Sequence, residues 1–165
     1  MARHKSMDPA PRPNAAHPRL PEFSYRGTFA YHLTIVSHKR ERNLLPAERV
    51  ISQALDEAAA ACDFELLAWV IMPDHMHMLT LGLLESSDCV RFLQRFKQLS
   101  AYRFKQRTGS RLWQPSFHDH VARTEEDLWA LAKYIVENPV RARLCDAIEE
   151  WPQMGGTLLT AEWRS

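Results

Sequence analysis

The sequence predicts an α+β domain with an antiparallel sheet. Two features of the chain carry this prediction. In some segments the apolar residues alternate with polar ones or follow one another directly, as in strands. Between these segments lie others in which apolar residues recur every three or four positions, as in helices. The resulting order is strand, helix, strand, strand, helix, strand, helix. Its first six elements match the ferredoxin-like split β-α-β pattern, in which helices pack on one face of an antiparallel sheet.

The first half of the chain supplies a strand, a helix and a second strand. Residues 28–37 alternate between apolar and polar side chains, which indicates a strand with one buried face. Pro46 then opens a helix whose apolar residues follow helical spacing up to Cys62. Residues 64–72 form a nearly continuous apolar run, which predicts a strand in the centre of the sheet.

A strand and a helix follow the turn at residues 73–74. Residues 75–83 are expected to form a strand that starts directly after this turn. A capping residue within 86–88 then starts a helix that reaches about Gln106. Residues 108–110, with their central glycine, end this helix.

The last predicted elements are a strand and a helix. Residues 113–121 are expected to form a loop and a strand. Residues 124–127 resemble a capping box, which starts a helix that reaches Glu137 or Asn138. Pro139 limits this helix, because the residue before a proline is pushed out of helical geometry.

The composition is that of a globular protein with one domain, since 45% of the residues are apolar and 25% are charged. Residues 1–21 hold five of the ten prolines, so we expect a disordered basic tail there and a single domain over residues 22–165. No apolar stretch is long enough to span a membrane, and the N-terminus lacks the apolar segment of a secretory signal. The three cysteines show no CxxC spacing, which favours free thiols in a reducing cytoplasm.

Basic residues are concentrated in part of the chain. The net charge is only +1, yet residues 91–111 hold seven basic residues and no acidic one. Residues 38–42 form a smaller basic group. Such segments favour a surface that binds a polyanion such as nucleic acid, and the alternative is a solvated helix face. The residues expected to contact DNA in these two segments are Lys39, Arg40, Arg91, Arg95, Arg103, Lys105 and Arg107.

Two histidines after the turn at residues 73–74 could bind a metal. His75 and His77 are two residues apart on a predicted strand, so their side chains point to the same face, about 6–7 Å apart at the backbone. This geometry suits a divalent ion that keeps open positions for water or substrate. Met76 and Met78 would then face the core. The alternative is a pair of ordinary strand histidines bonded to their neighbours.

Tyr134 and Asn138 lie four residues apart on the last predicted helix, and therefore on one helical face. Tyr134 sits at the edge of the buried stripe, from which its hydroxyl could reach a site across the sheet. The alternative is a core aromatic residue with a solvated hydroxyl. Tyr102, at the end of the basic helix, is a rival candidate for the same role.

A third segment carries another pair of histidines with same-face spacing. His118 and His120 could form a competing metal site, or they could make structural hydrogen bonds or line the same cleft as the first pair, together with Gln114. The chain has no Gly-rich phosphate loop, serine nucleophile elbow or Cys-His signature, which excludes the chemistries that depend on them.

Three motifs, in order, resemble one known family. Residues 68–77 contain His75-Met76-His77 and are similar to the His-hydrophobic-His (HUH) segment of the REP-associated tyrosine transposases. Residues 113–120 and 134–140 resemble two further motifs of that family, and the similarity runs from about residue 25 to residue 151. It implies a ferredoxin-like HUH domain that cleaves single-stranded DNA beside a hairpin.

The resemblance also implies roles for particular residues. Tyr134 matches the catalytic tyrosine, His75 and His77 the metal pair, and Asn138 a third ligand, with Mg²⁺ or Mn²⁺ as the ion. Arg26 lies where the family's N-terminal segment reads DNA near the cleavage site. The implied partner is hairpin-forming single-stranded DNA from a palindromic repeat. The resemblance further implies that the protein acts as a monomer or a homodimer. It would act in the bacterial cytoplasm, at the nucleoid, and would not bind a membrane.

We therefore expect a metal-dependent transposase that cleaves and rejoins hairpin-forming single-stranded DNA through a 5′-phosphotyrosine. One alternative is a domain of the same fold that binds hairpins without cutting them. Another is a metal hydrolase built on both histidine pairs, which would turn over without a tyrosine adduct. Tyr102 has no counterpart in the family, and the resemblance does not explain residues 1–21.

Overall fold

The structure is a computed structural model that describes residues 24–122 and 125–159. The predicted tail at residues 1–21 and the predicted helix cap at Thr124 lie outside the described residues.

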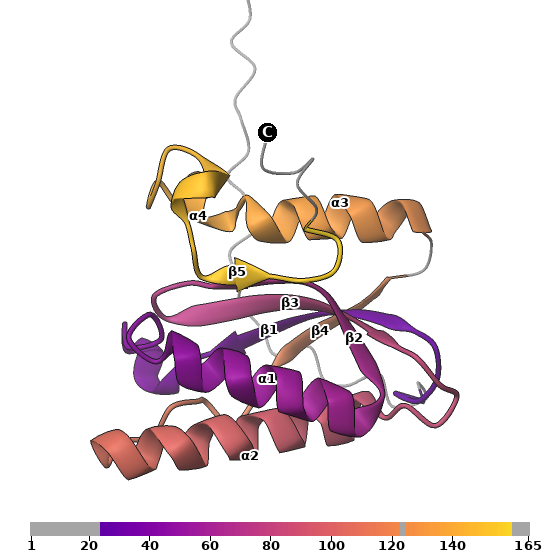
Figure 1. Cartoon of the computed structure of the whole chain (residues 1–165), viewed down its shortest axis with the longest axis horizontal. Helices are drawn as coiled ribbons and strands as arrows, with labels where there is room; N and C mark the ends of the chain where they lie inside the picture. The colour runs from indigo at the N-terminus through magenta and orange to yellow at the C-terminus, as the bar shows by residue number, and fades with distance from the viewer. Residues whose placement is uncertain (1–23, 123–124, 160–165) are drawn as a thin grey trace, which may run out of the picture.

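A five-stranded antiparallel sheet runs through the molecule in the order β4-β1-β3-β2-β5 (Figure 1). The order of the first four strands is the ferredoxin-like order, so the predicted fold class is confirmed. The fifth strand pairs with β2 at the edge of the sheet and was not predicted. The strands are β1 (Ala30–Val36), β2 (Phe64–Ile71), β3 (His75–Gly82), β4 (His118–Ala122) and β5 (Met154–Gly155).

Helices cover both faces of this sheet (Figure 1). The first two pack on one face, as predicted, whereas the last long helix covers the opposite face and adds a third layer. No helix in the described part of the chain is long and apolar enough to cross a membrane. The helices are α1 (Glu48–Cys62), α2 (Cys89–Thr108), α3 (Glu125–Val136) and the short α4 (Asn138–Arg141), with 3₁₀ turns at His38–Arg40 and Ile148–Glu150.

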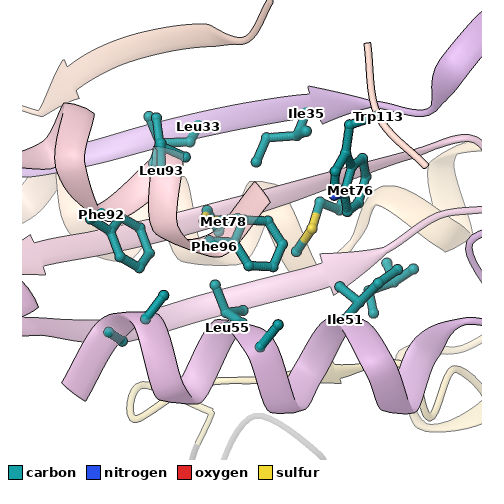
Figure 2. Packing of buried hydrophobic residues seen from close by; sticks show 14 of the residues in the cluster. Leu33, Ile35, Ile51, Leu55, Met76, Met78, Phe92, Leu93, Phe96 and Trp113 are labelled. Carbon is teal, nitrogen blue, oxygen red and sulfur yellow. The ribbon is translucent and has the colours of Figure 1, made fainter. Parts of the chain in front are cut away.

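The larger core lies between the sheet and helices α1 and α2 (Figure 2). β1 and β3 supply it with alternate residues, including the fully buried Leu33, Ile35, Met76 and Met78. Burial of both methionines confirms the prediction that they face the core. Because side chains alternate along a strand, the intervening residues of both strands point to the other face of the sheet.

A second core lies between the sheet and α3. Val70 and Leu79 from the sheet pack with Ala132, Ile135 and Val136 from α3, and all five are buried. This packing fixes α3 across the face that also carries the alternate residues of β1 and β3. Residues of α3 at the edge of its buried stripe therefore lie beside those strand residues.

Local signals set the ends of α2 as predicted. Asp88 is the N-cap, and its side chain accepts a hydrogen bond of 3.0 Å from the backbone N–H of Arg91. Gly109 ends the helix in the left-handed conformation, with φ of 73°. α2 is therefore held at both ends, and its basic residues are carried on one rigid element.

Candidate functional site

The site begins with two imidazoles at the start of β3. The ring centroids of His75 and His77 are 5.0 Å apart, and the rings are nearly perpendicular. Both lie on the face covered by α3, opposite Met76 and Met78, so the predicted same-face arrangement is confirmed.

Each of these imidazoles has a polar partner at Nδ1. His75 Nδ1 lies 2.7 Å from a carboxylate oxygen of Asp74, and His77 Nδ1 lies 2.9 Å from Oγ1 of Thr34. We assign an Nδ1 proton of each ring to these contacts, which leaves Nε2 as the nitrogen that can bind a metal. A polar partner on one imidazole nitrogen is the usual support for a histidine that binds metal through the other.

Thr34 reaches His77 because of the sheet register. In the antiparallel pair β1–β3, Thr34 stands opposite His77 and Val36 opposite His75. Thr34 and His32 were not among the predicted site residues. The signal that could have found them is the alternation of β1, whose buried residues leave His32 and Thr34 on the face of the histidine pair.

His32 connects this pair to Tyr134. Its Nε2 is 3.3 Å from His77 Nδ1, its ring centroid is 5.4 Å from that of His77, and Tyr134 meets it edge-on at 6.1 Å. Burial, with a smaller contribution from His120, lowers the pKa of His32 to about 4. Burial also lowers the pKa of His77 well below its ordinary value, and electrostatic repulsion by the neighbouring His75, His32 and Arg141 acts in the same direction. Both rings are therefore neutral at pH 7.

Asp74 is the anionic partner in the site. Burial opposes its ionisation, but the hydrogen bond with His75 and the charge of Arg40 lower its pKa on balance. The Arg40 guanidinium lies 3.4 Å from the second carboxylate oxygen. Asp74 therefore stays ionised and orients the His75 ring.

Tyr134 presents its side chain from α3. It is 49% exposed, in contrast to its buried neighbour Ile135, so it lies at the edge of the buried stripe as predicted. The guanidinium carbon of Arg141 lies 3.9 Å from the centre of its ring. This cation beside the tyrosine was not predicted, because it comes from α4, beyond the last predicted helix. Tyr102, the rival candidate, is exposed on α2 and thus on the other side of the sheet.

Asn138 lies at the junction of α3 and α4. Its amide nitrogen donates to the carbonyl oxygens of Tyr134 and Ile135, both at 3.2 Å. These bonds hold the amide at the end of α3 and leave its oxygen available as a ligand atom. The role of Asn138 as a third metal ligand stays a prediction.

The second histidine pair extends the same face of the sheet. In the β1–β4 register, His118 stands opposite Thr34 and His120 opposite His32. Within the described residues, no group of three or more His, Cys, Asp or Glu side chains is arranged to hold a metal ion. An ion held by His75 and His77 in this arrangement would take its further ligands from other groups, such as an amide oxygen, water or phosphate.

Arg40 borders the site through Asp74, whereas other predicted residues lie elsewhere. Gln114 lines a groove beside α2, on the opposite side of the sheet. Three of the basic side chains expected to contact DNA form ion pairs within the protein. Arg26 pairs with Asp88 at 3.2 Å, and Arg40 pairs with Asp74. Arg103 pairs with Glu57 through two hydrogen bonds of 2.9 and 2.7 Å. Lys39, Arg91, Arg95, Lys105 and Arg107 are exposed. Contact of these basic residues with DNA stays a prediction.

A ferredoxin-like sheet that sets a strand histidine pair beside a helical tyrosine is the arrangement that the resemblance to the HUH transposases implies. The profile of the family described as "Transposase IS200 like" matches residues 26–138, and the chain belongs to that family.

Known relatives agree with this assignment. The chain is 28% identical to the REP-associated tyrosine transposase of Escherichia coli strain K12 over 127 residues, which cover 76% of this chain and 74% of the relative. It is 27% identical over 148 residues to a putative REP-associated tyrosine transposase of Haemophilus influenzae, covering 78% and 82%.

Solved structures share the fold. A REP-associated tyrosine transposase bound to a REP hairpin superimposes with a TM-score of 0.71 at 20% identity, covering 90% of this chain and 97% of that one. A putative transposase from Deinococcus radiodurans gives a TM-score of 0.51 at 23% identity, covering 72% and 95%.

Proposed function

We propose that this protein is a metal-dependent single-strand DNA endonuclease and transposase, which cleaves and rejoins hairpin-forming DNA through a 5′-phosphotyrosine at Tyr134. The observation that carries the proposal is the contact series from Tyr134 through His32 to His77. These residues belong to one chain, so the proposal places the nucleophile and the histidine pair in the same subunit. The hairpin as substrate is supported by the relative whose structure is described as bound to a REP hairpin.

In the proposed reaction, the hydroxyl oxygen of Tyr134 attacks the phosphorus of a phosphodiester. A bond forms between phosphorus and the tyrosine oxygen, and the bond from phosphorus to the 3′ oxygen breaks. The phenolic proton leaves, and the departing oxygen takes up a proton to become a 3′-hydroxyl. Because a 3′-hydroxyl can attack the phosphotyrosine in reverse and release the tyrosine, the same residue serves as nucleophile in cleavage and as leaving group in rejoining.

His75, His77 and Asn138 are the residues proposed to hold Mg²⁺ or Mn²⁺, which when bound polarises the scissile phosphate and offsets its charge. The chemistry of the donors fits such an ion, since each imidazole has a polar partner at Nδ1 and the Asn138 amide is held through its nitrogen, which leaves its oxygen as a ligand atom. Arg141, stacked on Tyr134, adds a fixed positive charge beside the nucleophile, where an incoming phosphate would approach.

The test is a covalent adduct. The full-length protein is incubated with a labelled hairpin oligonucleotide carrying single-stranded flanks, with and without Mn²⁺, and separated on a denaturing gel. We expect a shifted band that requires Mn²⁺ and is absent in Tyr134→Phe, which still binds the hairpin because only one oxygen is lost. Tyr102→Phe is the matched control and should form the adduct normally.

Two results would argue against this function. An adduct that survives in Tyr134→Phe but disappears in Tyr102→Phe would place the nucleophile on α2. Hairpin binding without any adduct in the wild-type protein would favour the alternative function, a domain that binds hairpins without cutting them.

A further inference from the structure

A groove lies beside α2, on the face of the molecule away from Tyr134. It has a volume of about 520 Å³. One wall is a stripe along α2, and the other is the segment that returns from the end of this helix toward β4. The lining residues are His38, Gln94, Lys97, Gln98, Ala101, Lys105, Ser110, Arg111, Leu112, Trp113, Gln114 and Pro115.

The two walls are fastened together along their length. Lys97 donates from its ammonium to the carbonyl oxygens of Gln114, Pro115 and Ser116, at 2.6, 3.1 and 3.4 Å. At the inner side, the indole N–H of Trp113 donates to the hydroxyl of Ser100, which is buried in α2, at 2.8 Å. The groove is therefore a preformed feature of the fold. The span of α2 that lines it, Gln94 to Lys105, is roughly 16 Å long.

The chemistry of the groove suits an unpaired nucleotide chain. Cations line it at Lys97, Lys105 and Arg111, and none of the lining residues is acidic. Its floor is apolar, with Ala101 and Leu112 among the lining residues, while glutamine amides offer donors and acceptors for base edges. A cationic groove with an apolar surface is the usual combination for binding single-stranded nucleic acid. A duplex, whose bases are stacked and covered by its backbone, would gain nothing from the apolar floor.

The groove also lies near the histidine pair, around the end of the sheet. Val36, the last residue of β1, stands opposite His75, and its carbonyl oxygen accepts a hydrogen bond of 2.9 Å from the backbone of Gln114. His38, two residues further on, lines the groove. The turn between the two sites holds Lys39 and Arg40, both with φ near +55°. A DNA strand that leaves the histidine pair at this end would cross a basic turn before it reaches the groove.

We propose that this groove binds the unpaired flank of the DNA, a short stretch of single-stranded chain next to the hairpin. The proposal rests on the proposed function, because it takes hairpin-forming DNA as the substrate. It assigns Lys105 and Arg111 to backbone phosphates and the apolar floor at Ala101 to a base.

The test compares two hairpins with the same stem, one blunt and one with a single-stranded flank. Affinities are measured with the full chain in the presence of a chelator, so that no cleavage occurs. The quantity of interest is the ratio of the two affinities, because it isolates the contribution of the flank from contacts with the stem.

Two variants address the groove by different means. Lys105→Gln with Arg111→Gln removes two charges, and Ala101→Phe fills the floor without a change of charge. We expect each to lower the affinity ratio by roughly tenfold, the scale of one lost stacked base. In the double variant, the slope of log affinity against log salt should also decrease in magnitude by roughly 0.7 for each lost contact, and only for the flanked hairpin. Arg49→Gln with Arg143→Gln removes two exposed charges outside the groove, at residues that are not expected to contact DNA, and is the matched control.

The proposal is overturned if the ratio stays at its wild-type value in both groove variants, or if the control lowers it as much as they do. It is also overturned if the wild-type protein gains nothing from the flank. A wild-type protein that binds neither hairpin would instead contradict the proposed function. The Ala101→Phe variant distinguishes binding in the groove from binding to a diffuse basic surface, because only binding in the groove depends on the shape of its floor.

Discussion

Each imidazole of the histidine pair depends on a neighbouring side chain for its orientation. Asp74 precedes His75 in the chain, and its carboxylate contacts Nδ1 at 2.7 Å. Thr34 comes from another strand and contacts Nδ1 of His77 at 2.9 Å. The first partner could be predicted from the sequence by adjacency alone. The second depends on the register between β1 and β3, which no local pattern contains.

A first prediction concerns Thr34. Thr34→Val keeps the shape of the side chain but removes the acceptor for the Nδ1 proton of His77. We expect the affinity for Mn²⁺ to fall by about 10–100-fold, the usual effect of losing such a supporting partner. Thr34→Ser, which restores the hydroxyl, should bind Mn²⁺ like the wild type. Calorimetric titration measures both, and equal affinities in the two variants would show that this hydroxyl does not support a metal ligand.

A second prediction concerns the pH dependence of stability in metal-free protein. His32 has a pKa of about 4 when folded and an ordinary pKa of 6.5 when unfolded. Between these values the unfolded state binds more protons, so stability falls as pH drops from about 6.5 to about 4. The loss from His32 alone is about 3 kcal/mol.

The variant His32→Gln isolates this contribution. Its stability should fall less than that of the wild type over the same pH range, as measured by urea denaturation with a chelator present. His77 acts in the same direction and stays in both proteins, so some acid sensitivity persists. Parallel pH curves for the two proteins would mean that His32 is not held neutral by burial.

At the scale of the elements, the sequence predicted what local signals determine. The alternation of β1, the apolar run of β2 and both ends of α2 were predicted close to their observed positions. β5 was missed because it has only two residues, and its pairing with Trp69 and Val70 depends on contacts distant in sequence. A side chain at Gly155 would meet the Trp69 ring at 2.6 Å, so the need for glycine there is visible only in three dimensions.

A third prediction concerns the cap of α2. Asp88→Ala removes the acceptor for the Arg91 N–H and the partner of Arg26. We expect a loss of about 1 kcal/mol in the free energy of unfolding, measured by urea denaturation. Asp88→Asn keeps the cap but not the charge, so it should be close to the wild type. If Asp88→Asn is as unstable as Asp88→Ala, the ion pair with Arg26 matters more than the cap.

At the scale of the whole molecule, the sheet separates two surfaces of different character. One face carries the histidines and, through α3, the tyrosine, whereas α2 carries basic residues on the other side (Figure 1). The sequence predicted the chemical groups on both surfaces but not their separation, because the face on which a helix packs is decided by the second core around Val70 and Ile135. The proposed path of DNA must therefore pass around the sheet.

The central claim is that Tyr134 forms the covalent bond with DNA. The most direct measurement is mass spectrometry of the adduct after digestion with trypsin and nuclease, because cleavage after Lys133 and Arg141 isolates residues 134–141 with one tyrosine. We predict that this peptide carries a nucleotide joined through a 5′-phosphate to Tyr134, in samples incubated with Mn²⁺ and hairpin DNA. A nucleotide found on a peptide that contains Tyr102, with an unmodified 134–141 peptide, would contradict the account.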